Sequence, residues 1–396
     1  MKKKIVASLM VAALAFSMAA CGNKADNKAP AGDAQASAEQ EQQTPAEPEQ
    51  EPTEQPADTA GDAEIKSTGP NGEQGVSADT ITLTDEQIAK VKEGNYKVAI
   101  VFHYAGNDWS TAQQQGIEDT CKELGMEVVA VTNADFSAEQ QVSDIETVMA
   151  LDPDVIISIP TDATATADAY QRAADKGIKV VFMDNVAAGM EAGKDYVSCV
   201  SADAYGNGVA AAEILGEQLG GKGDVGMVYY DVDFFTTNLR DQGFKETMAA
   251  KYPDINIVTE QGFTDENGCN EQGDAILTQY PNINGIYASW DIPMEGVLSS
   301  VKAAGNEGQV GLSAIDLGNN IALEIAKGTV AGVGAQRPYD QGVTEVKCAA
   351  LSLLGEQLPA FVVCPALPVT KDNVCEAYEE VYHVSAPDWL KEAAGK

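Results

Sequence analysis

The run Lys97-Val98-Ala99-Ile100-Val101-Phe102 contains five consecutive apolar residues. A short apolar run of this kind predicts a strand that is buried on both faces, as strands of parallel sheets are. A stretch of helical length, 111–124, follows it and precedes the next apolar run, 128–131. The alternation continues with strands expected at 155–159 and 179–183, and helices at 138–151 and 163–176. It predicts a doubly wound α/β domain.

The same alternation then starts again. Further strands are expected at 225–230, 255–258, 285–289 and 310–315, with helices near 205–219, 237–250, 270–279, 294–304 and 320–327. A third block, 332–369, adds strand, helix and strand. Two such series predict two similar α/β lobes, with a ligand cleft where the carboxyl ends of their strands face each other.

The start of the chain predicts an export signal. Met1–Lys4 is basic, and the apolar stretch Ile5–Ala20 is too short to span a bilayer comfortably. The sequence Met18-Ala19-Ala20-Cys21-Gly22 resembles a bacterial lipobox, which implies cleavage after residue 20 and acylation of Cys21. An ordinary cleavage site with a cysteine nearby by chance is the alternative. Residues 21–94 are expected to form a disordered acidic linker, since the stretch 22–79 holds almost no large apolar residues.

Composition favours binding over catalysis. The 396 residues include 61 acidic and 25 basic ones, and a net charge of -36 argues against a nucleic-acid partner. The only histidines are His103 and His383, which argues against multi-histidine metal sites. No nucleophile elbow, paired-histidine motif or Cys-x-x-Cys is present. We therefore expect no enzyme activity, no cofactor and no metal; if any disulfide forms, Cys364 and Cys375 are the most plausible pair.

Polar and aromatic side chains gather at the expected carboxyl ends of the strands, where they would line the cleft. The candidate ligand-binding residues are Asn107, Trp109, Asp184, Asn185, Arg240, Phe263, Trp290, Asp291, Asp316 and Gln336. All of them except Asp291 have a structural alternative. The aromatic residues could pack in a core, Asp184 and Asp316 could cap helices, Arg240 could form a surface salt bridge, and the amide residues could serve in turns or hinges.

Several of these motifs resemble one family over 96–370. Asn107-Asp108-Trp109, Pro160-Thr161-Asp162, Asp184-Asn185, Arg240-Asp241-Gln242-Gly243-Phe244, Trp290-Asp291, Asp316 and Gln336 are similar to motifs of the type I periplasmic binding proteins of sugar ABC importers, close to the ribose-binding branch. Two positions depart from that pattern. Asn185 stands where the family has an arginine, and Trp290 where it has an asparagine, which puts ribose itself in doubt.

The residue types suit a sugar. Carboxylates accept hydrogen bonds from hydroxyls, and arginine donates hydrogen bonds in a fixed planar geometry. Side-chain amides both donate and accept. The flat faces of Trp109 and Trp290 suit the C–H face of a sugar ring. A monosaccharide or a polyol is expected, and an anionic sugar is less favoured because Arg240 is the only cation among several acids.

The resemblance implies two lobes joined by three strands that close on the ligand like a hinge. The lobes would comprise 95–202 with 337–369, and 203–336 with 370–396, with crossings near 201–202, 336–337 and 369–370. The resemblance also implies a monomeric, extracytoplasmic, lipid-anchored protein that delivers its ligand to an ABC permease. A ligand sensor that docks a membrane receptor, for example for a furanosyl autoinducer, needs the same cleft and is the alternative. The tail, 371–396, is expected to add a helix without a role in chemistry.

Overall fold

The computed structural model describes residues 65–396. The expected signal peptide, the acylation site Cys21 and the linker up to residue 64 lie outside the described residues. Within 65–396, none of the helices combines the length and the apolar character that a membrane crossing requires.

The first lobe is a seven-stranded sheet in the order β1-β12-β6-β5-β4-β2-β3. All its neighbouring strands run parallel. The strands are β1 (Val76–Ser77), β2 (Lys97–Phe102), β3 (Glu127–Asn133), β4 (Val155–Ser158), β5 (Lys179–Met183), β6 (Cys199–Ala202) and β12 (Phe361–Cys364). The helices are η1 (Ala78–Thr80), α1 (Asp85–Gly94), α2 (Asp108–Glu123), α3 (Ala138–Met149), α4 (Ala167–Asp175) and α10 (Pro338–Leu353).

The second lobe is a six-stranded sheet in the order β13-β11-β10-β9-β7-β8. Its strands are β7 (Lys222–Tyr230), β8 (Asp254–Phe263), β9 (Gly285–Ala288), β10 (Gly311–Ile315), β11 (Gly332–Ala335) and β13 (Leu367–Thr370), and only β13 is antiparallel to its neighbour. The helices are α5 (Ala204–Gln218), α6 (Phe235–Lys251), η2 (Glu266–Gly268), α7 (Asn270–Gln279), α8 (Asp291–Ala303), α9 (Asn319–Lys327), α11 (Val374–Tyr382) and α12 (Asp388–Ala394). Leaving out the short β1, the two sheets have the same strand order, so β5 and β10 occupy equivalent places.

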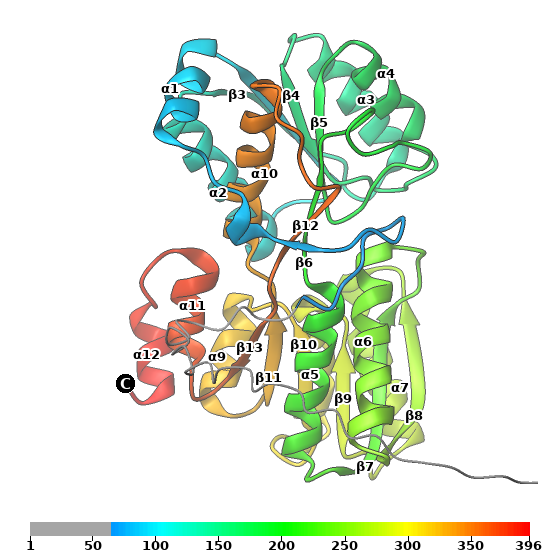
Figure 1. Cartoon of the computed structure of the whole chain (residues 1–396). Helices are drawn as coiled ribbons and strands as arrows, with labels where there is room; N and C mark the ends of the chain where they lie inside the picture. Colours follow the sequence, from blue (N-terminus) through cyan, green and yellow to red (C-terminus); the bar gives the residue numbers. More distant parts are fainter. Residues whose placement is uncertain (1–64) are drawn as a thin grey trace, which may run out of the picture. The chain divides into compact units, whose positions relative to one another are not determined.

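Alternate residues of each strand serve two hydrophobic layers. In β2, Val98 and Ile100 pack with α2 and α10, whereas Ala99 and Val101 pack with α3 and α4. Figure 1 shows these helices on the two sides of the first sheet. The expectation of a doubly wound α/β fold in two lobes is confirmed.

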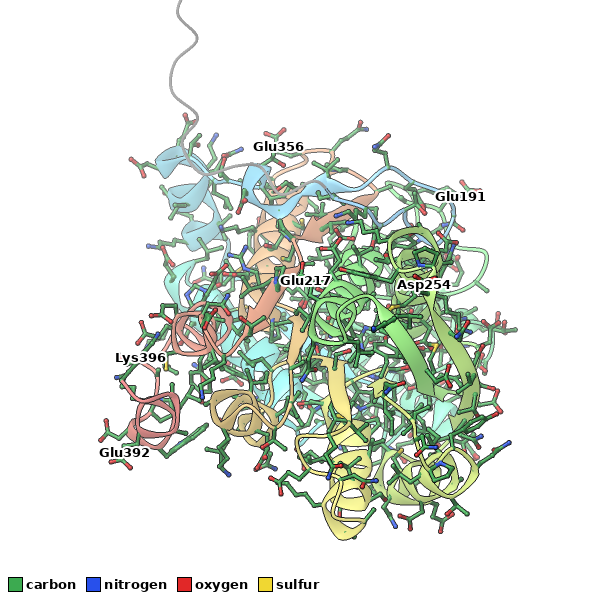
Figure 2. All side chains as sticks on the ribbon, turned by 90° about the horizontal axis from the view of Figure 1, so that it is seen from below. Glu191, Glu217, Asp254, Glu356, Glu392 and Lys396 are labelled. Atoms are coloured by element: carbon green, nitrogen blue, oxygen red, sulfur yellow. The ribbon has the colours of Figure 1, made fainter. Side chains whose placement is uncertain are left out.

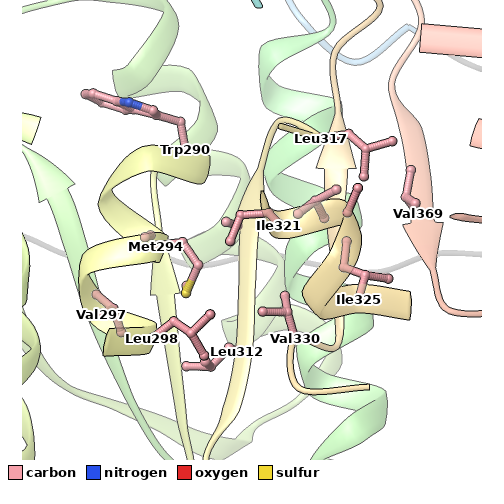
Figure 3. Packing of buried hydrophobic residues seen from close by; sticks show 14 of the residues in the cluster. Trp290, Met294, Val297, Leu298, Leu312, Leu317, Ile321, Ile325, Val330 and Val369 are labelled. Carbon is pink, nitrogen blue, oxygen red and sulfur yellow. The ribbon is translucent and has the colours of Figure 1, made fainter. Parts of the chain in front are cut away.

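The largest hydrophobic cluster of the second lobe lies under α8 and α9. Met294, Leu312 and Ile321 are fully buried in it, and Trp290 is 6% exposed. Figure 3 shows Trp290 at one end of this cluster, just ahead of the first turn of α8. The cluster therefore supports Trp290 from below and leaves it at the boundary of the lobe.

Three segments cross between the lobes. The first lies between β6 and α5, the second between β11 and α10, and the third between β12 and β13. The third crossing was expected at 369–370, but it falls at 365–366, because 361–364 pair with β6 and 367–370 pair with β11. The lobe boundary predicted at 369 is therefore wrong, since the whole of β13 belongs to the second sheet.

Residues 65–94 also differ from the prediction, because they are structured and are not part of a disordered linker. β1 pairs with β12 in the first sheet, and Thr84 caps α1 through a capping box. Residues 66 and 67 are bound to the carboxylate of Asp203, at the first crossing. We call residues 65–77 the N-terminal strap, since they connect the start of the second lobe to the sheet of the first.

The cysteines at 121, 199, 269, 348, 364 and 375 are all buried and free. The disulfide between Cys364 and Cys375 does not form in this structure. Burial among apolar residues accounts for them as small core residues.

Candidate ligand-binding site

A cavity lies between the lobes, at the carboxyl ends of their strands. Both lobes contribute to its wall, which is formed by His103, Tyr104, Trp109, Phe136, Ile159, Asp184, Tyr230, Phe234, Thr236, Thr237, Arg240, Trp290, Asp316 and Gln336. Six of the ten candidate residues are among them. This mixture of aromatic and polar side chains is typical of small-molecule sites.

Two aspartates occupy equivalent positions in the two lobes. Asp184 follows β5 and Asp316 follows β10. Both have left-handed backbones, with φ of 50° and 70°. This conformation is costly for a residue other than glycine, and it is commonly retained where it aims a functional side chain. The repeated α/β pattern thus presents one carboxylate to the cavity from each side.

The Asp184 carboxylate is held on one oxygen. Its Oδ1 accepts from Ser201 Oγ at 2.8 Å and from Gln341 Nε2 at 3.2 Å. No hydrogen bond to its Oδ2 occurs within residues 65–396. The side chain is 3% exposed, so its orientation is fixed while one oxygen remains available.

Arg240, Asp316 and Gln336 form a connected group on the opposite wall. Gln336 Nε2 donates to Asp316 Oδ1 at 2.8 Å, and Arg240 Nη1 lies 3.8 Å from Asp316 Oδ2. Arg240 Nη1 also donates to the backbone oxygen of Ser289 at 3.2 Å, and Ser289 Oγ donates to Asp241 Oδ1 at 2.8 Å. The guanidinium is therefore fixed in place before any ligand binds.

Burial and the charges around the cavity shift the pKa values of its two aspartates. Burial raises the pKa of Asp184 and of Asp316, and the Arg240 guanidinium counteracts part of that rise in both. Burial lowers the pKa of His103 to about 3, so its imidazole is neutral near neutral pH. Arg240 is the only lysine or arginine among the buried residues that the structure describes.

Four buried polar atoms on lining side chains have no hydrogen-bond partner within 65–396. They are His103 Nδ1, Trp109 Nε1, Arg240 Nε and Gln336 Oε1. Buried polar atoms are almost always hydrogen-bonded in folded proteins. Thirteen other such atoms lie elsewhere among the described residues, but these four are on residues that line the cavity, where a ligand with several donors and acceptors can pair with them.

Aromatic rings supply much of the remaining wall. Trp290 packs edge-on against Tyr230 with ring centroids 5.4 Å apart, and its Nε1 donates to Glu266 Oε2 at 2.9 Å. His103 stacks on Phe234 across the two lobes, with centroids 5.7 Å apart. Trp290 is thus fixed by both its ring and its nitrogen, and it offers a rigid apolar surface to the cavity.

The other four candidate residues do not line this cavity. Asn107 caps α2 through Ser110 N and donates to Tyr104 OH, and Phe263 packs against Trp290 with centroids 5.0 Å apart. Asn185 lies in a neighbouring groove, and Asp291 lies in a small adjoining cavity. Asn107 and Phe263 therefore support lining residues from behind.

Eight lining residues were not anticipated from the sequence, and most of them are aromatic. They are His103, Tyr104, Phe136, Ile159, Tyr230, Phe234, Thr236 and Thr237. The sequence positions of some of them could have identified them as candidates. Tyr104 and Tyr230 stand at or just after expected strand ends, and Phe234 follows an acidic turn where a lone aromatic ring has no core to enter.

The lobes touch each other around the cavity. Asn319, at the start of α9, donates to the Asp108 carboxylate through its backbone nitrogen at 2.7 Å and through Nδ2 at 2.9 Å. His383, after α11, stacks on Tyr339 of α10 with centroids 4.2 Å apart, and its Nε2 lies 2.8 Å from Asp340 Oδ1. The tail therefore takes part in the contact between lobes.

A family of known proteins matches most of the folded chain. Residues 98–357 match the family model described as periplasmic binding protein domain. The chain belongs to that family. The match covers β3 to β11, nearly all of β2 and all the residues that line the cavity.

Individual relatives agree with the family. The binding protein is 26% identical to the D-ribose/D-allose-binding protein of Pseudomonas aeruginosa, over 74% of this chain and 89% of the relative. It is 25% identical to the xylitol-binding protein of Mycolicibacterium smegmatis, over 70% and 78%. A solved ABC transporter periplasmic solute-binding protein from Actinobacillus succinogenes, with bound D-allose, aligns with a TM-score of 0.66 and 26% identity, over 70% of this chain and 99% of that one. The resemblance found in the sequence is confirmed at the level of the family and the fold.

Proposed function

We propose that the protein captures a monosaccharide or a polyol between its lobes and delivers it to an ABC importer. The observation that carries this proposal is the group of four unpartnered polar atoms around one cavity, together with the two carboxylates and the fixed guanidinium. A polyhydroxylated ring can satisfy such a set, because each hydroxyl both donates and accepts. The sugars and the polyol that the relatives are named for support the same ligand class.

Closure of the lobes is the physical event that would report ligand binding to a permease. Ligand contacts from Asp184 in one lobe and from Arg240 and Asp316 in the other favour the closed arrangement over an open one. A ligand shifts such an equilibrium only by its differential affinity for the two arrangements. The contacts that span both lobes supply that difference.

Tryptophan fluorescence of the full chain tests ligand capture. Of its three tryptophans, Trp109 and Trp290 line the cavity and Trp389 lies in α12. Titration with D-ribose, D-allose, D-glucose, xylitol and myo-inositol should give a saturable change with at least one compound, together with a rise in melting temperature. If no compound changes either signal, the proposed ligand class is wrong.

We further propose that the mature chain is held outside the cytoplasm by a lipid on Cys21, on the strength of the lipobox-like sequence 18–22. Intact-mass spectrometry of protein from its own host should give a chain that begins at Cys21 with acyl groups added. The Cys21→Ala variant should lack these groups. An unmodified mature chain would contradict the anchor and leave the binding proposal intact.

A further inference from the structure

A small side cavity, with room for about one water-sized group, adjoins the main one. Trp109, Asp316 and Gln336 line both cavities, so these three residues separate the two spaces. The rest of the side cavity is lined by Asp291, Leu317, Gly318, Pro338, Val381 and Tyr382. Two of these come from α11, so the C-terminal tail closes one wall of the side cavity.

Free acceptors predominate in this side cavity. Asp291 Oδ1 accepts from Ile292 N at 2.9 Å, whereas no hydrogen bond within 65–396 reaches its Oδ2. Gln336 is 3% exposed, and its Nε2 is used by Asp316, so its unpartnered atom is the acceptor Oε1. Asp316 Oδ2 has only the Arg240 nitrogen at 3.8 Å. Among the side chains of this wall, the buried donor without a partner in residues 65–396 is Trp109 Nε1.

The local backbone allows the Asp291 carboxylate to stand here. A Cβ at Gly318 would meet Asp291 Oδ2 at 2.0 Å, so only a glycine permits this approach. The hydroxyl of Tyr382 cannot satisfy the carboxylate, because it donates to the Leu317 backbone oxygen at 2.6 Å. Asp291 is therefore a buried acid near a second acid, and among residues 65–396 no donor reaches its Oδ2.

This arrangement is electrostatically unbalanced. Burial raises the pKa of Asp291 well above its usual range, and the charges of Asp316, Glu295 and Asp108 raise it further. Arg240, the only buried lysine or arginine among residues 65–396, is engaged with Asp316 and the Ser289 backbone oxygen. Buried ionised carboxylates are costly unless a cation or several donors accompany them.

We propose that the ligand is a polyhydroxylated amine, an amino sugar or an aminocyclitol, whose ammonium group enters the side cavity. The proposal rests on the proposed function, because the hydroxylated ring occupies the main cavity. An ammonium group has three N–H donors and no acceptor, so it can bond Asp291 Oδ2, Asp316 Oδ2 and Gln336 Oε1 together. A hydroxyl has one donor and leaves most of these acceptors unpaired.

Matched ligands test this inference on the wild-type full chain. D-glucosamine, D-galactosamine and D-mannosamine would be compared by calorimetry at pH 7 with their neutral parent hexoses and with their N-acetylated forms, which lack the charge. At least one amine should bind roughly 10–100-fold more tightly than its parent and its acetylated form, as charge-assisted hydrogen bonds imply. Neutral sugars or polyols that bind while every amine binds equally or more weakly overturn the inference and leave the proposed function standing. If neither the amines nor the neutral compounds bind, both the inference and the proposed function are wrong.

A pair of variants locates the effect. Asp291→Asn removes the charge with little change in shape, so the ratio of amine to parent affinity should fall to within about threefold. Asp254→Asn makes the same chemical change at the exposed start of β8, where Figure 2 shows Asp254 at the surface, and it should leave the ratio unchanged. An unchanged ratio in Asp291→Asn contradicts the proposed place of the ammonium group.

Discussion

Replacing Arg240 with alanine will lower ligand affinity by at least about 30-fold. Truncating one partner of a buried, hydrogen-bonded charge pair costs about 2–5 kcal/mol, and about 1.4 kcal/mol corresponds to a factor of ten. Arg240 has an additional role, because it counteracts the effect of burial on the pKa of Asp184 and Asp316. Without the guanidinium, both acids bind protons more readily and lose acceptor strength. Calorimetric titration with the best ligand of the fluorescence panel measures the loss.

Two companion variants separate binding from folding. Arg240→Lys keeps a positive charge but loses the planar fork, so an intermediate affinity is expected. Arg172→Ala removes an exposed arginine that pairs with Glu146, and it should bind like the wild type. Circular dichroism must show that each variant is folded. If a folded Arg240→Ala variant keeps wild-type affinity, Arg240 does not contribute to ligand binding.

Replacing Asp203 with alanine will destabilise the protein by about 2–4 kcal/mol, because buried donors lose their partner. The Asp203 carboxylate accepts from Lys66 N at 2.9 Å, Ser67 N at 2.9 Å, Ser67 Oγ at 2.7 Å and Gly206 N at 3.0 Å. The last of these bonds caps α5, and the others hold the N-terminal strap. Urea unfolding measures the loss, and trypsin should cleave after Lys66 faster in the variant.

Asp168→Ala is the matched control for this change. Asp168 also lies in the first turn of a helix, α4, but it is exposed. Its removal should cost about 0.3–1 kcal/mol, the usual size of a charge interaction at a helix terminus. If Asp203→Ala costs no more than Asp168→Ala, the strap is not held by the Asp203 carboxylate.

The strands were predictable where the apolar runs were continuous. The expected 97–102 and 179–183 coincide with β2 and β5. The N-terminal strap was not predictable, because its residues are polar and β1 is only two residues long. Backbone pairing with β12 and the distant Asp203 hold it in place, and neither contact leaves a periodic pattern in the strap itself.

The candidate site was predictable where the repeat of the fold dictated it. Asp184 and Asp316 follow equivalent strands, so the α/β alternation alone places them at the same edge of each sheet. Phe136 and Phe234 come to the cavity from loops, and their positions depend on the packing of one lobe against the other.

The contacts of the tail were also not predictable from the sequence. A helix in the tail, 371–396, was expected, but the contacts of Tyr382 and His383 with residues around the cavity depend on how α11 docks.

The attachment of residues 66 and 67 at Asp203 has a mechanical consequence. A force that reaches the folded part through the preceding chain is applied where the chain crosses from β6 to α5, beside the pivot between the lobes. Applied so near the axis, it has a short lever arm and exerts little torque on either lobe. Tension along the proposed lipid tether would therefore leave the angle between the lobes, and with it the occupancy of the cavity, almost unaltered.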